Sequence, residues 1–261
     1  MYKISWEKRE ILLVVKTYPA RSKKYGDIVC TASILEDTNE WIRIYPVDWL
    51  EFIKKDLKKF VRIEVEVKKD TSDYLHRKES YKIRNSSIKV IDDSLTKTQK
   101  KGVWNERKKI LLNVATDSIK TLNNDYEDDR TSLGMIKPNE RDLRFYSVKP
   151  IEEIEINIEE STQYTILGEK LKKVDVIEKA FKYKFKCNYD KCKGHNMICE
   201  DWELLQAFRN FKSRYNIVDT EKHLKYKFEK WMIDKRDLYF ILGTHWQFPK
   251  FMIIGLFYPP K

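Results

Sequence analysis

The clearest pattern along the chain is a strict alternation of apolar and charged residues over positions 61–69. Val61, Ile63, Val65 and Val67 point to one side of an extended chain, and the charged residues between them point to the other. Side chains of a β-strand alternate between its two faces. The segment therefore predicts a strand with one face buried and one face exposed.

Shorter apolar runs predict four or five further strands in the first third of the sequence. They cover residues 10–16, 27–36, 40–46 and 81–92, and the polar turn at 37–39 is typical of a hairpin. Apolar residues recur at helical spacing between positions 47 and 60, which predicts one short amphipathic helix. Several short strands with a single helix favour a small β-barrel of the OB or PUA type.

The remainder of the chain mixes helices and strands. Helices are expected over 96–115, 116–126, 201–215 and 219–232, and strands over 179–187, 237–243 and 251–258. The last two strands show no polar alternation, which is typical of strands buried on both faces. Alternating isoleucines predict another strand at 151–158, and residues 159–172 are expected to form an exposed connection. The predicted class is α+β, with a C-terminal mixed sheet that carries two helices.

Three regions follow from this pattern. Residues 1–95 form the expected barrel and nucleic-acid-binding region, residues 96–172 a helical and connecting segment, and residues 173–261 a C-terminal α+β region. The segment 1–19 has too short an apolar core for a secretory signal, and no apolar run could span a membrane. We therefore expect a cytoplasmic protein without a membrane partner.

Charge adds a preference for polyanions. Lys and Arg number 52 against 41 for Asp and Glu, a formal net charge of +11, and the excess lies in the two ends of the chain around an acidic middle. Basic surfaces attract nucleic acid because phosphate neutralisation releases counterions. A lysine-rich composition without functional meaning is the alternative explanation.

Three of the four cysteines and one histidine lie within 13 positions, as Cys187, Cys192, His195 and Cys199. Thiolates and imidazole are the ligands that Zn²⁺ prefers, and four of them would complete a structural tetrahedral site. If residues 196–199 form a strand, however, Cys199 would turn away from His195 into the core. Only three ligands would then remain, and metal occupancy would be weak or absent. A third possibility is that these cysteines are small buried packing residues.

Two acidic residues follow the cysteines directly. Asp201 is expected to cap the helix that begins there, with Glu203 in its first turn, although both carboxylates could also act in a cleft as catalytic groups. His245 and Trp246 follow an apolar strand, where a histidine could move a proton or contact phosphate and a tryptophan could stack on a base. Asp201, Glu203 and His245 are thus the candidate catalytic set.

The N-terminal half supplies candidate nucleic-acid contacts. Arg77, Glu79, Trp104 and Arg107 are residue types that grip phosphate or stack on bases, though each is also ordinary on a protein surface. Glu66-Val67-Lys68, with Asp48 upstream, superficially matches the acidic-acidic-lysine pattern of restriction-type nucleases. That pattern is common by chance inside an alternating strand.

A series of motifs, in order over nearly the whole chain, resembles a family of uncharacterised prokaryotic proteins. The motifs are VVKTYPARSKKYGDIVCTA, WIRIYP, RKESYKI, VWNERKKILL, SLGMIKP, CEDWEL and FILGTHWQFPKFMIIGLFYPP. Some members carry the cysteine and histidine element and others lack it, so the resemblance implies a structural metal clip. The family has no settled activity, and Val47-Asp48-Trp49 replaces its frequent Pro-Phe-Arg.

Three functions remain open at this point. A nucleic-acid-binding protein ranks first. An enzyme acting on nucleic acid or a nucleotide, such as a glycosylase or nuclease, ranks second and requires Asp201, Glu203 and His245 to converge in one pocket. A protein-interaction module ranks third and requires a broad exposed apolar patch.

Overall fold

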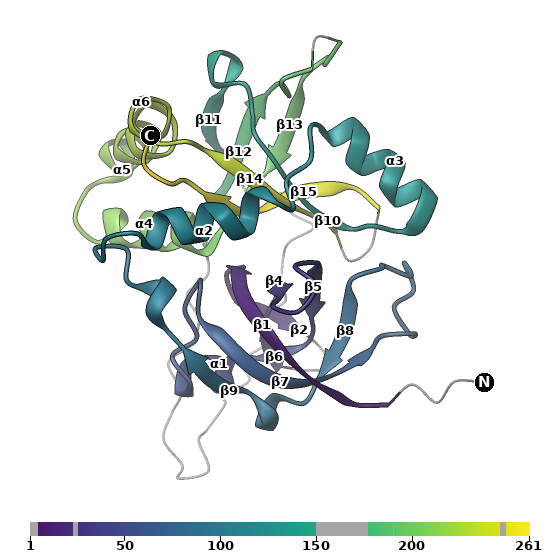
Figure 1. The fold of residues 1–261 in the computed structure, drawn as a ribbon. Helices are drawn as coiled ribbons and strands as arrows, with labels where there is room; N and C mark the ends of the chain where they lie inside the picture. Colours follow the sequence, from purple (N-terminus) through teal and green to yellow (C-terminus); the bar gives the residue numbers. More distant parts are fainter. Residues whose placement is uncertain (1–4, 23–25, 150–176, 190, 246–248) are drawn as a thin grey trace.

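The computed structural model describes residues 5–22, 26–149, 177–189, 191–245 and 249–261. Its N-terminal barrel and its C-terminal α+β half lie against each other (Figure 1). The strand expected at 151–158, the connection at 159–172 and Trp246 lie outside the described residues.

The barrel is closed and five-stranded, with strand order β1-β4-β5-β8-β7 and a final pairing of β7 with β1. Its strands are β1 (Glu7–Lys16), β4 (Thr31–Leu35), β5 (Trp41–Ile44), β7 (Arg62–Lys69) and β8 (Ser80–Ile83). Strand β9 (Lys89–Asp92) extends the sheet beside β7, and a small sheet joins β2 (Ala20–Ser22), β3 (Gly26–Val29) and β6 (Val47–Asp48). Helix α1 (Trp49–Lys54) begins at Asp48, whose carboxylate accepts from the Leu50 amide at 2.7 Å.

Two strands explain the hydrophobic patterns of this half. Strand β7 alternates between buried and half-buried residues, as predicted, because only one of its faces lines the barrel interior. Strand β1 is apolar without alternation because both of its faces are covered. Ile11 and Leu13 fill the barrel, whereas Leu12 and Val14 pack against the C-terminal half.

The C-terminal half contains two further sheets and the helices. One sheet has the order β10 (Leu133–Ile136), β14 (Tyr239–Thr244), β15 (Phe251–Phe257), and the other β11 (Arg144–Val148), β12 (Ala180–Phe185), β13 (His195–Ile198). Helices α2 (Val103–Leu112) and α3 (Ile119–Asp129) connect it to the barrel. Helix α4 (Trp202–Lys212) is followed by α5 (Ile217–Lys225), a π-helical segment (Tyr226–Trp231) and α6 (Met232–Lys235).

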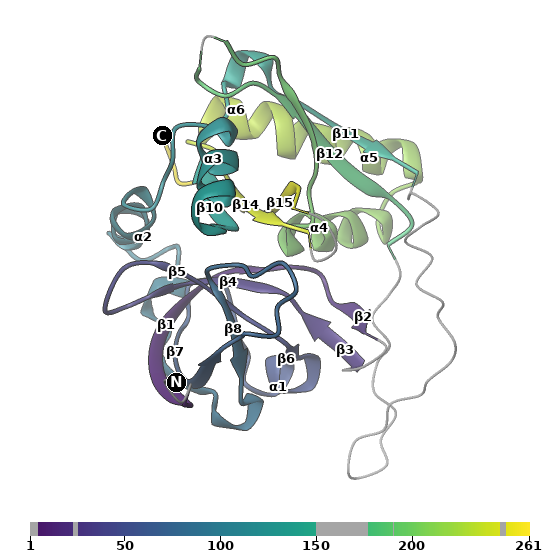
Figure 2. The same cartoon turned by 90° about the vertical axis from the view of Figure 1, so that its right-hand side faces the viewer.

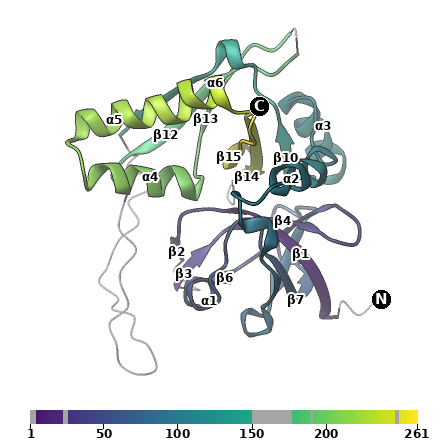
Figure 3. The same cartoon turned by 60° about the vertical axis from the view of Figure 1, so that its left-hand side comes forward.

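The β10-β14-β15 sheet is the middle layer of the molecule. It lies next to the barrel, and β11 and β12 lie on the side away from the barrel (Figure 2). Helices α4 and α5 run side by side on one flank (Figure 3). Along β14, Tyr239 and Ile241 face the cluster shared with the barrel, whereas Phe240 and Leu242 face the second cluster. This double burial is why strands β14 and β15 lack polar alternation.

The α+β class, the N-terminal barrel and the C-terminal sheets with helices are confirmed. Two details differ. The strand expected at 27–36 is divided at Cys30 into β3 and β4, which belong to different sheets, and the helix expected over 96–115 covers only Val103–Leu112. None of the helices in the described ranges combines the length and the apolar character needed to cross a membrane.

Candidate functional site

A cleft of about 590 Å³ lies where the barrel meets the C-terminal half. It is lined from the end of β1, the turn before β7, helices α2 and α4, the π-helical segment and the end of β15. The lining combines aromatic rings with a large excess of cationic groups, and Glu203 is its one acidic residue among those described.

The floor of the cleft is a hydrogen-bonded network around Lys59. Its Nζ lies 3.0 Å from Asp201 Oδ2 and 3.4 Å from Glu203 Oε2, and it donates to the Leu256 carbonyl oxygen at 3.2 Å. The Tyr258 hydroxyl donates to Glu203 Oε2 at 2.7 Å. Lys59 is 8% exposed and Asp201 is fully buried, so the network joins the barrel to α4 and β15 in the interior.

Local backbone structure fixes these side chains. Asp201 caps α4, since its Oδ1 accepts from the Glu203 and Leu204 amides at 2.8 and 3.2 Å, and its Oδ2 accepts from the Leu256 amide at 2.9 Å. On the other side, Phe60 adopts a left-handed φ of 68°, which is unusual for a bulky residue. Its amide donates to Leu13 on β1, and this turn directs Lys59 toward Asp201.

Burial and charge shift the titration of these groups. Burial alone would lower the pKa of Lys59, but Asp201 and Glu203 together raise it. Burial would likewise raise the pKa of Glu203, yet Lys59 holds it below its ordinary value. For Asp201, burial raises the pKa against the opposing attraction of Lys59. Lys59 therefore stays charged, and it neutralises the carboxylates on the cleft floor.

Two arginines flank Trp104 at the wall of the cleft. The Arg107 guanidinium lies 4.8 Å from the Trp104 ring centroid and 3.9 Å from that of Phe60. The Arg236 guanidinium lies 6.0 Å from Trp104 and 4.5 Å from Trp231. Stacking on aromatic faces is favourable for guanidinium groups and holds them in place.

Neither arginine has an acidic partner among the described residues. Arg107 donates only to the Leu95 carbonyl oxygen, at 2.8 Å from Nε, and burial lowers its pKa to about 10. Arg236 Nε is buried without a hydrogen-bond acceptor in the described part of the chain. Lys16 and Lys227, which also line the cleft, have no ion pair within the described ranges either. The cleft therefore holds four cations without an ion pair among the described residues, although the charge of Glu203 still acts on Arg107 and Lys16.

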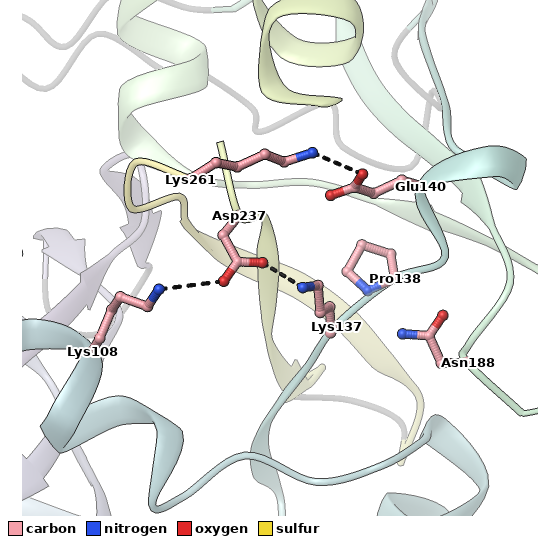
Figure 4. Close-up of a pocket in the computed structure, with 7 residues that line it drawn as sticks. All are labelled: Lys108, Lys137, Pro138, Glu140, Asn188, Asp237 and Lys261. Carbon is pink, nitrogen blue, oxygen red and sulfur yellow. Dashed lines mark hydrogen bonds and ion pairs between the residues drawn. The ribbon is translucent and has the colours of Figure 1, made fainter. Parts of the chain in front are cut away.

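A second pocket differs from the cleft because its lysines form ion pairs with acidic residues. It has about 550 Å³ and lies on the surface near the C-terminus, and its lysines are paired with acids (Figure 4). Lys108 and Lys137 contact Asp237 at 3.6 and 2.5 Å, and Lys261 contacts Glu140 at 2.9 Å. The two pockets are similar in size, so charge compensation rather than volume distinguishes the cleft as the candidate site.

The structure separates the residues proposed as one catalytic set. Glu203 lines the cleft and Asp201 lies beneath it, but His245 follows β14 at a distance from the cleft, where burial and the charge of Arg77 lower its pKa.

The residues proposed as nucleic-acid contacts are also divided. Arg77 Nε donates a hydrogen bond to Asp73 Oδ2 at 2.6 Å. Glu79 is buried and accepts from the Ser132 amide, which ties β8 to the start of β10. Of the proposed nucleic-acid contacts, Trp104 and Arg107 reach the cleft.

Three of the four proposed metal ligands come together. Cys187 Sγ and Cys192 Sγ lie 3.4 and 3.2 Å from His195 Nε2, and the ligand atoms of this group lie within 4.8 Å of one another. Cys199 is outside the group. It follows strand β13, is 2% exposed, and packs in the core beside Ile253. Residues 195 and 199 share one face of the strand, so it is the rise of about 13 Å over four extended residues, not alternation, that separates Cys199 from His195. This is the three-ligand arrangement that the strand geometry allowed.

Sequence reasoning missed most of the cleft. Lys16, Lys59, Lys227, Arg236 and Tyr258 were not singled out, because each is a common residue in a lysine-rich or apolar segment. A usable signal was present only for Arg236, which lies three residues before the buried strand β14. The other four are brought together solely by tertiary contacts between the two halves.

These features define an α+β protein in which a closed barrel and a C-terminal layered half share one cationic, aromatic cleft. Residues 115–261, more than half of the chain, match the family model described as "Domain of unknown function (DUF8757)", and the chain belongs to this family. Residues 7–113 match the model described as "Domain of unknown function (DUF8758)". No curated protein matches the chain. The predicted membership of an uncharacterised family is thus confirmed.

Proposed function

We propose that the protein binds nucleic acid, with the phosphate backbone and one or more bases held in the cleft beside Trp104. The observation that carries this proposal is the pair of guanidinium groups, Arg107 and Arg236, which flank one tryptophan and have no acidic partner among the described residues. Cations without an ion pair bind phosphate, and the aromatic rings that line the cleft, among them Trp104 and Trp202, are residue types on which bases stack. The π-helical segment that supplies Lys227 supports the proposal, since such segments are frequent at functional sites.

A single strand is the preferred form of the ligand. A cleft of about 590 Å³ is too small for a duplex but can accept one or two unstacked nucleotides. Stacking on tryptophan also requires bases that are free of their own stack.

The test is a fluorescence anisotropy titration with single- and double-stranded DNA and RNA of mixed sequence. Four phosphate contacts predict a slope of about −3 for log K against log salt, or roughly a 50-fold loss of affinity between 50 and 200 mM salt. Failure to bind any of the four ligands at low salt would overturn the proposal, as would binding without salt dependence.

We also propose that Cys187, Cys192 and His195 hold a zinc ion through three protein ligands, with no fourth protein ligand among the described residues. The donor set fits, because a tetrahedral zinc separates its sulfur and nitrogen ligands by roughly 3.5 Å, close to the observed 3.2 and 3.4 Å. The Cys187 amide donates to Cys192 Sγ at 3.3 Å, and the Ile119 amide donates to Cys187 Sγ. Amide donors of this kind orient metal-bound thiolates. The ion would tie the β12–β13 connection to the start of α3.

The cytoplasm is the compartment that we propose, because the cysteines of a zinc site must stay reduced.

A further inference from the structure

Lys16 is placed differently from the other lysines of the cleft. It ends strand β1, and its Nζ lies 4.4 Å from the Trp202 ring centroid and 5.3 Å from that of Phe52. Its hydrogen bond within the described part of the chain is a long contact of 3.5 Å to the Leu57 carbonyl oxygen. The amine thus lies against two aromatic rings that are stacked on each other, with centroids 6.1 Å apart, and it has no ion pair among the described residues.

The surroundings of Lys16 favour the neutral amine. Burial and the positive charge of Lys59 lower the pKa of Lys16 to about 8. Glu203 and Asp201 raise the pKa of Lys16, but their carboxylates already accept hydrogen bonds from Tyr258 and Lys59. At pH 7.5 roughly a quarter of such amines are neutral, against about one in a thousand for an ordinary lysine. Neighbouring Lys58 differs, because Asp56 raises its pKa.

A neutral lysine beside a second cation, in a cleft that binds substrate, is the arrangement that makes an amine nucleophilic toward carbonyl groups. The four cations of the cleft that form no ion pair among the described residues favour a ligand with phosphates, and intact nucleic acid offers no aldehyde. An abasic site does, because its deoxyribose opens to a free aldehyde between two phosphates.

We propose that Lys16 forms a covalent imine with the aldehyde of an abasic site in a DNA strand bound in the cleft. This inference rests on the proposed nucleic-acid binding. The Lys16 nitrogen attacks the aldehyde carbon and forms a C–N bond, and the carbonyl oxygen leaves as water with two of the protons of the original ammonium group. The product is a protonated imine, so atoms and charge balance without a cofactor.

The experiment uses the full chain and a single-stranded oligonucleotide that carries one abasic site, with cyanoborohydride to reduce the imine to a stable secondary amine. Wild-type protein is expected to give a cross-linked band in denaturing electrophoresis, and peptide mapping should place it on Lys16. Trapping should increase between about pH 6.5 and about pH 9, as the amine loses its proton.

Two variants and a second ligand give the controls. Lys16→Gln should lose the adduct, whereas Lys8→Gln, an exposed lysine of the same strand, should keep it. Binding is measured in parallel on the tetrahydrofuran analogue, which lacks the aldehyde. Lys16→Gln should bind it with a salt slope reduced by about one, because one phosphate contact is lost, and trapping is compared at protein concentrations that saturate this analogue. If wild-type protein binds the analogue but traps no abasic strand, or if the adduct survives in Lys16→Gln, this inference is overturned alone. If wild-type protein binds neither strand, the proposed function fails with it.

Discussion

Lys59 and Asp201 are separated by 142 residues in the sequence, and their side chains meet at 3.0 Å in the interior between the two halves. A buried pair of this kind is costly to break from one side, because the remaining charge loses its partner. The pair therefore acts as an ionic link between the barrel and helix α4.

Replacing one partner should destabilise the whole chain. We expect Lys59→Met and Asp201→Asn each to lower the free energy of unfolding by about 3–5 kcal/mol, because each leaves the other charge buried without this partner. An asparagine that caps α4 would also turn its amide nitrogen toward the Leu256 amide and Lys59, where an acceptor is needed. The double variant should lose less than the sum of the two. Urea denaturation measures all three, and Lys58→Met, an exposed neighbour, should change stability by less than about 0.5 kcal/mol. Strict additivity would contradict the link.

The charge of Lys16 should weaken the folded state at neutral pH. Its folded pKa of about 8 lies below the ordinary value of 10.5, so between these values the unfolded chain binds more protons. Stability due to this group therefore rises with pH over that range. Lys16→Met removes the group, and its stability advantage over wild type should shrink from pH 7 to pH 10. A difference that does not change with pH, in urea denaturation of both proteins, would refute this.

The zinc content of the protein should depend on Cys187, Cys192 and His195. Protein purified without a histidine tag is expected to contain about one equivalent of zinc by elemental analysis. Cys192→Ser and His195→Ala should lose most of it, whereas Cys199→Ala should retain it because Cys199 faces the core. Cys30→Ala serves as the control for a cysteine outside the group. Equal zinc in Cys192→Ser and wild type would leave these cysteines as packing residues.

A lysine of the cleft without an ion pair should contribute more to nucleic-acid affinity than a lysine that an acidic residue already neutralises. Lys227→Gln should weaken binding and reduce the salt slope by about one, since one phosphate contact is lost. Lys261→Gln removes a lysine that Glu140 already neutralises, and it should leave both quantities nearly unchanged. Equal effects of the two substitutions would show that general surface charge, rather than the cleft, determines binding.

The contact between β15 and β1 leaves no room for a methyl group at Gly255. A Cβ atom there would lie 2.7 Å from Val15 Cγ2. Gly255→Ala should therefore cost about 1–3 kcal/mol of stability through overpacking. Shortening the opposing side chain in Gly255→Ala/Val15→Ala should recover part of this loss relative to Val15→Ala alone. If the double variant shows no recovery in thermal unfolding, the two strands are not in tight contact.

Local patterns of apolar and polar residues predicted most of the fold. The alternation in β7 and the continuous apolar runs of β14 and β15 directly reflect one-sided and two-sided burial, and periodicity reports burial. The division at Cys30 was missed because both parts of the segment have strand-like composition, and only their partners assign them to different sheets.

The residues of the cleft were harder to predict from the sequence than the fold was. Asp201 was recognised as a cap because capping depends on neighbouring residues. Its pairing with Lys59 could not be inferred, since it depends on how two separate sheets approach each other. His245 was grouped with Asp201 and Glu203 by residue type, but it lies beyond the other end of β14, in the electrostatic neighbourhood of Arg77.

The apolar cluster that Leu12 and Val14 of β1 share with Leu133 and Ile254 has a consequence for how this protein can evolve. The two family matches divide the chain near residue 114, yet the cluster crosses that boundary. A recombination event at this point, which joined the barrel of one family member to the C-terminal half of another, would place two unmatched surfaces in one interior. Such chimaeras would survive only if both surfaces had changed together, so the two halves should diversify as a single heritable unit.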